Sequence, residues 1–190
     1  EKYETARREF KRSLRYYKRL DDRAGIAKTV YHLGVVAYKQ GINEYHESRR
    51  RLTAVSGDHG IANSLHKLGK IAFNHDDCET ARDCFNDSIK VCYVSSRDRG
   101  IIAKNLHHLG VIADNRGNYE TAREYFQDSI EINRELNDRG GIAKNLHRLG
   151  VIAGNRGNYE TAREYYENSL DLREELNDRA GIAKTVNDLG

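Results

Sequence analysis

Residues 139–178 read RGGIAKNLHRLGVIAGNRGNYETAREYYENSLDLREELND, and residues 99–138 read RGIIAKNLHHLGVIADNRGNYETAREYFQDSIEINRELND. When residues 101–140 are aligned with residues 141–180, 28 of the 40 positions are identical. A period of about 20 to 50 residues is typical of a solenoid, in which each unit buries its apolar face against its neighbours. The sequence therefore predicts a stack of similar units with a period of 40 residues.

The composition of the chain fits such a stack. Charged residues make up 32% of the 190 residues and hydrophobic residues 38%. This apolar share is small for one globular core, but it is enough for helix pairs that each bury a single stripe. No apolar run approaches the roughly 20 residues that a membrane-spanning helix needs, and no signal peptide is visible. We therefore expect no membrane partner.

Three cysteines, Cys78, Cys84 and Cys92, fall within one repeat at spacings of six and eight residues. These spacings match no metal motif, and an odd number of cysteines cannot all pair within the chain. We therefore expect reduced thiols and a cytoplasmic protein. The chain contains no Met and both opens and closes inside a repeat, which indicates a fragment of a longer protein.

Each unit contains two helical patterns joined by a tight turn. The first, helix A, ends near Gly157 in the fourth unit, where Gly is the expected C-terminal breaker. The second, helix B, starts at Tyr159 and stops at Asn177 and Asp178, which can also cap the next helix A. The apolar residues of helix A recur at helical spacing: Ala143, Leu146, Leu149, Gly150, Ile152 and Ala153. The two helices should form an antiparallel hairpin.

The two patterns divide the chain into about four and a half repeats of an all-α array. We expect helix B at 1–20, repeats at 22–57, 58–97, 99–137 and 139–177, and the start of another helix A at 179–190. From Gly41 to Gly60 the chain is five residues shorter than from Gly157 to Gly181, so the second helix of repeat 22–57 should be shortened.

A set of small and aromatic residues resembles the motif of the tetratricopeptide repeat. That motif has Leu-Gly and a small residue in helix A, then Ala, an aromatic residue and a small residue in helix B. The units carry Leu149-Gly150, Ala153, Ala162, Tyr166 and Ser169; Leu109-Gly110, Ala113, Ala122, Phe126 and Ser129; Leu68-Gly69, Ala72, Ala81, Phe85 and Ser88; and, in the opening half-unit, Ala6, Phe10 and Ser13. The resemblance covers the chain except about residues 42–57 and implies an α-solenoid, a right-handed superhelix of stacked antiparallel hairpins.

The chain departs from the family pattern in two ways. The usual helix-A aromatic residue is replaced by Val30, Leu65, Leu106, Leu146 and Val186, and the usual Pro after helix B is absent. These features are closest to the Pins/LGN type of repeat and to bacterial and archaeal arrays. Gly150 and Ala162 lack bulk where the helices of a hairpin cross, and we expect the ring of Tyr166 to fill the gap to the next unit.

The side of helix A opposite its apolar stripe holds Lys144, His147, Arg148 and Val151. In the family, helix A lines a concave groove, so the resemblance implies that these positions bind a partner. The equivalent positions of the units, taken together, are Lys28, Tyr31, His32, Val35, Tyr38, Asn63, His66, Lys67, Lys70, Phe73, Lys104, His107, His108, Val111, Lys144, His147, Arg148 and Val151. Basic side chains would meet the carboxylates of an acidic peptide, and apolar ones would hold its anchors.

Two features of this predicted groove leave alternatives open. Lys104, His107, Lys144 and Arg148 resemble the family's carboxylate clamp, whereas exposed charges on helices are often only solvated surface. His66, His107 and His147 recur in line, but helices of neighbouring units lie about 10 Å apart. An ion bound at about 2 Å would not reach two such histidines, so we expect no metal. A change of histidine charge below about pH 6.5 remains open.

The sequence offers no support for catalysis. It contains no nucleophile elbow, no phosphate loop and no His-Glu-x-x-His motif, so we expect neither an enzyme nor a cofactor. Residues 1–57 carry a net charge of +7 and the rest −4. The basic residues Arg7, Arg8, Lys11, Arg12, Arg15, Lys18 and Arg19 suggest nucleic acid or an acidic domain as an alternative partner. End-to-end association of two copies is a third option.

Overall fold

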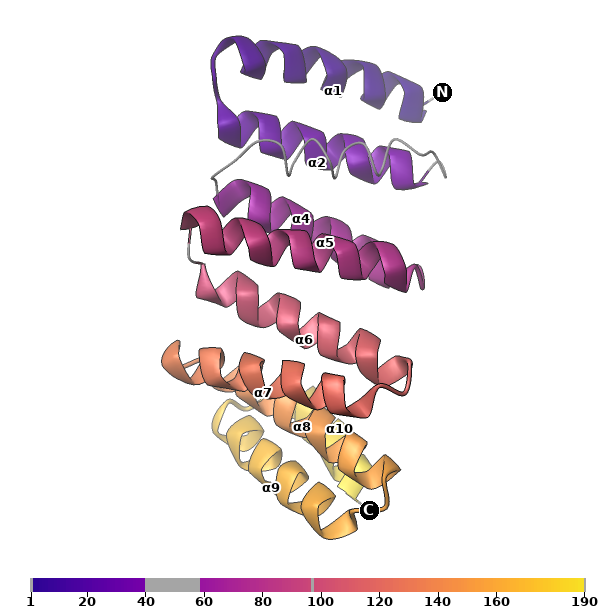
Figure 1. Ribbon diagram of the computed structural model, residues 1–190, viewed down its shortest axis with the longest axis vertical. Helices are drawn as coiled ribbons and strands as arrows, with labels where there is room; N and C mark the ends of the chain where they lie inside the picture. Colours follow the sequence, from indigo (N-terminus) through magenta and orange to yellow (C-terminus); the bar gives the residue numbers. More distant parts are fainter. Residues whose placement is uncertain (1, 40–58, 97, 190) are drawn as a thin grey trace. The chain divides into compact units, whose positions relative to one another are not determined.

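The computed structural model describes residues 2–39, 59–96 and 98–189, which are mostly helical (Figure 1). The elements are α1 (Lys2–Arg19), α2 (Arg23–Lys39), α4 (His59–Phe73), α5 (Cys78–Val91), the π-helix η1 (Cys92–Ser96), α6 (Arg99–Asn115), α7 (Tyr119–Glu135), α8 (Arg139–Asn155), α9 (Tyr159–Glu175) and α10 (Arg179–Leu189). The described residues contain no strand, which confirms the predicted all-α fold. The shortened helix predicted within residues 42–57 lies outside the described residues.

The chain divides into two compact units, Glu1–Ile101 and Ile102–Gly190. In the first unit, α1 packs on α2, α2 on α4, and α4 on α5, which continues into η1. In the second unit, α7 packs on α8, α8 on α9, and α9 on α10. None of the described helices is long and apolar enough to span a bilayer. Adjacent helices thus pack as the pairs that the repeat predicts.

A glycine and an aromatic ring form the crossing point inside each complete described hairpin. A Cβ atom added to Gly150 would lie 2.6 Å from Cε1 of Tyr166, which is closer than real Cβ atoms approach. Gly69 meets the ring of Phe85 and Gly110 that of Phe126 in the same way. The ring therefore packs at the crossing of its own hairpin, a contact beyond the predicted one with the next unit.

A buried serine joins the two helices of each of these hairpins. Its hydroxyl donates to the carbonyl oxygen of an alanine in helix A of the same repeat, from Ser88 to Ala62 at 2.7 Å, Ser129 to Ala103 at 2.9 Å and Ser169 to Ala143 at 2.8 Å. Each serine is inaccessible to solvent. A hydroxyl buried here needs this acceptor, because an unsatisfied polar group in the interior is costly.

Short-range features mark where the helices begin and end. The side chains of Asp138 and Asp178 accept hydrogen bonds from the backbone N–H groups of Gly141 and Gly181, at 2.9 and 3.0 Å. The capping role predicted for Asp178 is therefore confirmed. At the turn from helix A to helix B, Gly157 has a φ of +77°, a conformation that costs glycine little.

Candidate binding face of the A helices

One position in helix A of several repeats carries an exposed lysine. These residues are Lys28 in α2, Lys104 in α6, Lys144 in α8 and Lys184 in α10. Both neighbours of Lys144 along the chain, Ala143 and Asn145, are only 1% exposed. The neighbours of Lys28 and Lys104 are buried as well. The backbone therefore directs these ammonium groups away from the core, and within each unit we call the surface that they mark the A-helix face of that unit.

The residue after each of these lysines belongs to a buried polar position that the sequence pattern did not reveal. Its members are Thr29, Ser64, Asn105, Asn145 and Thr185. The Nδ2 group of Asn145 donates to the carbonyl of Gly141 and to Oγ of Ser129, both at 2.9 Å. Oδ1 of Asn145 accepts from Nδ1 of His107 at 2.7 Å. A polar residue recurring directly after the lysine was the available signal.

The histidines predicted to line the groove lie further inside than expected. His147 is 2% exposed and His66 is 9% exposed, while His107 is half-buried. Their rings pack on the aromatic rings of their own hairpins, with centroid separations of 5.5 Å to Tyr166, 5.9 Å to Phe85 and 5.7 Å to Phe126. His147 and His66 are thus interior residues of the hairpins and do not form part of the exposed A-helix face. The histidines are buried because a glycine lies three residues after each of them. The glycine has no side chain, so the aromatic ring of helix B can approach helix A and cover the histidine.

In the first unit, α2 and α4 bring aromatic and cationic side chains together. Nζ of Lys67 lies 5.9 Å from the ring centroid of Tyr31, within the range of a cation–π contact. The ring of His32 stacks on Phe10 with a centroid separation of 5.2 Å. Burial lowers the pKa of His32, and the charges of Lys28 and Lys67 lower it further. This part of the A-helix face is therefore positive at neutral pH.

In the second unit, basic residues of α8 change the pKa values of His107 and Asp114 in α6. Burial lowers the pKa of His107, the hydrogen bond that His107 donates to Asn145 opposes this, and the charges of Arg148 and Lys144 lower the pKa further. Burial raises the pKa of Asp114, and Arg148 partly offsets that increase. The two basic residues of α8 thus lie close enough to α6 to create a shared positive potential.

The strongest shift belongs to His147. The pKa of His147 is lowered from 6.5 to about 4, mainly by burial and then by the charges of Lys184 and Arg173, while Asp188 opposes the shift. Nε2 of His147 lies 3.3 Å from Oδ2 of Asp188. The imidazole is consequently neutral near pH 7, and it contributes no charge to the A-helix face.

The other predicted site residues divide by exposure. Lys67 and Lys70 are exposed, and Val111 is buried. Half-buried residues are Tyr31, His32, Val35, Asn63, Phe73, His108, Arg148 and Val151. Tyr38 lies in α2, but its side chain is outside the described residues. Val111 is therefore part of the core and cannot serve as an apolar anchor for a partner.

Two further observations concern cysteines and metals. No disulfide joins Cys78, Cys84 and Cys92 in the described part of the chain. Among the residues that the structure describes, no group of three or more His, Cys, Asp or Glu side chains could hold a metal ion.

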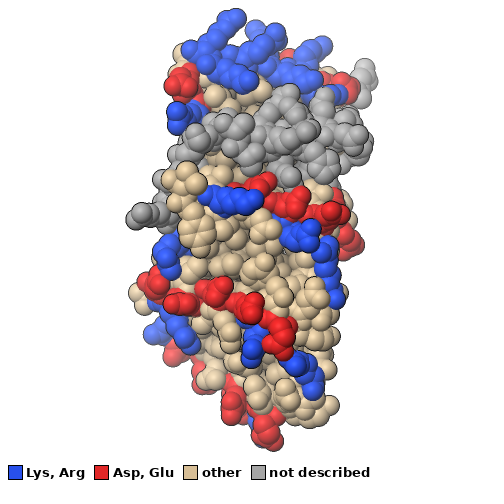
Figure 2. Space-filling view, viewed as in Figure 1, with Lys and Arg blue, Asp and Glu red and all other residues tan. Residues whose placement is uncertain are grey.

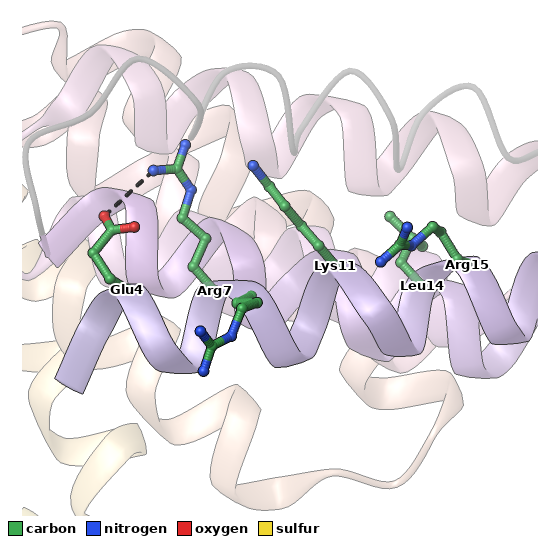
Figure 3. Close-up of a pocket in the computed structure, with 6 residues that line it drawn as sticks. Glu4, Arg7, Lys11, Leu14 and Arg15 are labelled. Atoms are coloured by element: carbon green, nitrogen blue, oxygen red, sulfur yellow. Dashed lines mark ion pairs between the residues drawn. The ribbon is translucent and has the colours of Figure 1, made fainter. Parts of the chain in front are cut away.

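The N-terminal helix carries a second charged surface. Six basic residues of α1 are exposed, and Figure 2 shows Lys and Arg gathered over this helix: Arg8, Lys11, Arg12, Arg15, Lys18 and Arg19. An open hollow of about 610 Å³ runs along α1 (Figure 3) and is lined by Glu4, Arg7, Arg8, Lys11, Leu14 and Arg15. Oε1 of Glu4 lies 3.5 Å from Nη1 of Arg7, so the lining contains an ion pair beside its other cations.

Comparisons with known proteins agree with the fold. Residues 101–175 match the family model described as tetratricopeptide repeat. No curated protein sequence matches the chain. The structure of BtubC (BKLC) from P. vanneervenii resembles it with a TM-score of 0.72 at 15% identity, covering 98% of this chain and 81% of that chain. MamA gives a TM-score of 0.64 at 20% identity, covering 93% of this chain and 91% of that chain.

A third structure, of pilF from Pseudomonas aeruginosa, gives a TM-score of 0.54 at 18% identity and covers 97% of this chain and 90% of that chain. Identities this low show the fold alone. The glycine–aromatic crossing and the buried serine bond of residues 101–175 also occur in the hairpin of α4 and α5, outside the matched range. The family match thus shows tetratricopeptide repeats over residues 101–175, and the hairpin of α4 and α5 carries the same internal contacts.

Proposed function

We propose that this chain is a cytoplasmic protein-interaction scaffold, or the sensing arm of a larger protein, that binds an acidic peptide on the A-helix face of its second unit and catalyses no reaction itself. The tetratricopeptide repeat fold indicates protein partners. The observation that carries the proposal is the recurrence of an exposed lysine between buried neighbours in helix A. The odd number of cysteines and their spacing favour this location, because disulfides are rare in the cytoplasm.

The charges of the second unit favour an acidic partner. Lys104, Lys144 and Lys184 are exposed on α6, α8 and α10. Lys144 and Arg148 both lower the pKa of His107, so cations of α8 lie near α6. Peptide carboxylates would relieve their mutual repulsion and form charge-assisted hydrogen bonds. Asp114 already offsets part of the charge of Arg148, which leaves Lys104 and Lys144 as the main contacts.

The half-buried apolar residues would hold the anchors of the peptide. Val151 offers a partly exposed apolar surface in the second unit. The A-helix face of the first unit has apolar surfaces of the same kind at Tyr31, Val35 and Phe73. A few buried apolar or aromatic side chains usually supply most of the affinity at such interfaces. The peptide we expect therefore combines several Asp or Glu residues with one or two apolar side chains.

A charge-reversal experiment tests this proposal. Acidic peptides selected on an array would be titrated against the wild type and the variant Lys104→Glu/Lys144→Glu/Arg148→Glu. The matched control is Arg123→Glu/Arg134→Glu/Arg163→Glu, which changes the net charge equally at exposed positions of the B helices. We expect the first variant to weaken binding by more than about tenfold and the control by less than about twofold.

Circular dichroism would verify that both variants are folded, so that a loss of binding can be assigned to the changed charges. Equal losses in the two variants would mean that binding follows net charge and not the A-helix face. Unchanged binding in the first variant would mean that its cations are solvated surface. Either result contradicts the proposed site.

A further inference from the structure

The first and last B helices of the chain occupy equivalent repeat positions but carry opposite charge. Both begin with the pattern Tyr-Glu-Thr-Ala-Arg, at 3–7 in α1 and at 159–163 in α9, and the alignment runs without a gap to Gly25 and Gly181. At five positions a basic residue of α1 corresponds to an acidic residue of α9: Arg8 to Glu164, Lys11 to Glu167, Arg15 to Asp171, Lys18 to Glu174 and Arg19 to Glu175. All ten side chains are exposed.

The five positions form one stripe along each helix. Their spacings of three, four, three and one residues place them within an arc of about 100°. The stripe from Arg8 to Arg19 is about 16 Å long, because an α-helix rises about 1.5 Å per residue. The stripe from Glu164 to Glu175 has the same length and spacing. The basic and acidic stripes therefore match one another in geometry.

Exposed apolar residues flank both stripes. Tyr3 and Leu20 lie at the two ends of the basic stripe with exposures of 46% and 58%. Tyr159 and Leu176 lie at the equivalent ends of the acidic stripe with exposures of 74% and 46%. In an antiparallel pair, the tyrosine end of each helix lies at the leucine end of the other.

We propose that α1 of one copy binds α9 of a second copy in this antiparallel manner, so that the chain self-associates head to tail. The surfaces involved differ on the two copies, and such a contact need not close, so it can propagate into longer assemblies. Helix α7 is a poorer match because it has Gln127 and Arg134 at two of the five positions. The acidic occupant of the basic stripe is therefore α9.

The residues of the stripes already make some contacts within the chain. Glu175 pairs with Arg139. Oε1 of Glu167 lies 3.3 Å from Nε of Arg163, and Nε of Arg8 lies 3.7 Å from Oε1 of Glu9. These ion pairs are exposed, and exposed pairs contribute little to stability. Replacing these ion pairs by pairs with a second copy therefore costs little free energy. The same argument makes the association sensitive to salt.

Sedimentation velocity measures the expected association directly. The wild-type chain should form dimers and larger species as its concentration rises in about 50 mM NaCl, and should return to the monomer in about 500 mM NaCl. A wild-type chain that stays monomeric at low salt up to several hundred micromolar would overturn the proposal without any variant.

Charge reversal then tests which helices meet. The α1 variant is R8E/K11E/R15E/K18E, and the α9 variant is E164K/E167K/D171K/E174K, which leaves the pair between Glu175 and Arg139 intact. Each variant alone should remain monomeric at low salt. An equimolar mixture should associate again, because each variant then offers the charge that the other lacks.

A control variant on α7, E124K/D128K/E131K/E135K, has the same change in net charge as the α9 variant and should still associate. Association that is lost in this control as well, or that is not restored in the mixture, would overturn the pairing of α1 with α9. A monomeric wild type that binds duplex DNA, together with an α1 variant that does not, would also overturn the proposal. In that case α1 would be a nucleic-acid site.

Discussion

Replacing Gly150 by alanine tests the crossing at the centre of the hairpin formed by α8 and α9. The added Cβ atom would lie 2.6 and 2.7 Å from Cε1 and Cδ1 of Tyr166 and 3.1 Å from its Cζ. The ring cannot swing into solvent freely, because Tyr166 is only 7% exposed and its centroid lies 5.5 Å from that of His147. The substitution must therefore shift either the ring or the helices.

The expected cost follows from two opposing terms. Inserting a methyl group into a packed core costs about 1–3 kcal/mol, whereas replacing Gly by Ala inside a helix gains about 1 kcal/mol. Gly154 supplies the control, because a Cβ atom there meets only Cβ of Ala162 at 3.9 Å. Gly154→Ala should thus stabilise the protein by about 1 kcal/mol. The gain in helix propensity is common to both variants, so Gly150→Ala should be about 1–3 kcal/mol less stable than Gly154→Ala.

Urea unfolding followed by far-ultraviolet circular dichroism gives this difference. The comparison between two variants of one helix remains informative even if the repeats unfold in more than one step. If Gly150→Ala proved as stable as Gly154→Ala, the close approach of the Tyr166 ring would not limit the packing of this hairpin. Gly110→Ala provides a second test, since its Cβ atom would lie 2.6 Å from Cε1 of Phe126.

Two further outcomes are expected. The folded-state pKa of His147 is lowered to about 4 from 6.5. Above about pH 6.5 the imidazole is neutral in both the folded and the unfolded state, so it does not reduce the free energy of unfolding. As the pH drops toward 4, the unfolded state binds a proton that the folded state does not, and the free energy of unfolding falls by at most about 3 kcal/mol. His147→Gln should flatten the pH dependence of unfolding, and an unchanged slope would contradict the assignment. Ser129→Ala removes the hydroxyl that donates to Ala103 and accepts from Asn145. It should cost about 1–3 kcal/mol, and thermal unfolding against the exposed substitution Thr121→Ala would measure this; equal stability would show that the bonds are dispensable.

Much of the fold could be predicted from the sequence because its determinants are local or periodic. The 40-residue period, the Leu-Gly pair and the aromatic residue of helix B define the hairpin, and the structure places Gly150 against Tyr166 inside it. Asp178 caps α10 through a backbone group only three residues away. Interactions of this range are set by neighbouring residues and leave a direct trace in the sequence.

The candidate site was predicted less completely. The exposed lysines could be read from the helical wheel, because residues opposite an apolar stripe face away from the core. The burial of His147 could not be predicted in this way, because His147 lies near the border of the apolar stripe. Its ring is drawn inward by contacts with Tyr166 of the following helix and by burial against α10 of the next repeat.

The sequence by itself thus determined the helices, their pairing and the row of lysines, since each depends on residues within one repeat. Only the tertiary structure decided which polar side chains are buried between repeats. Asn145 bonds to His107, which lies 38 residues away in the chain. Whether such a residue faces solvent or a neighbouring helix depends on how closely two repeats approach, and this is set by packing that no single helical pattern contains.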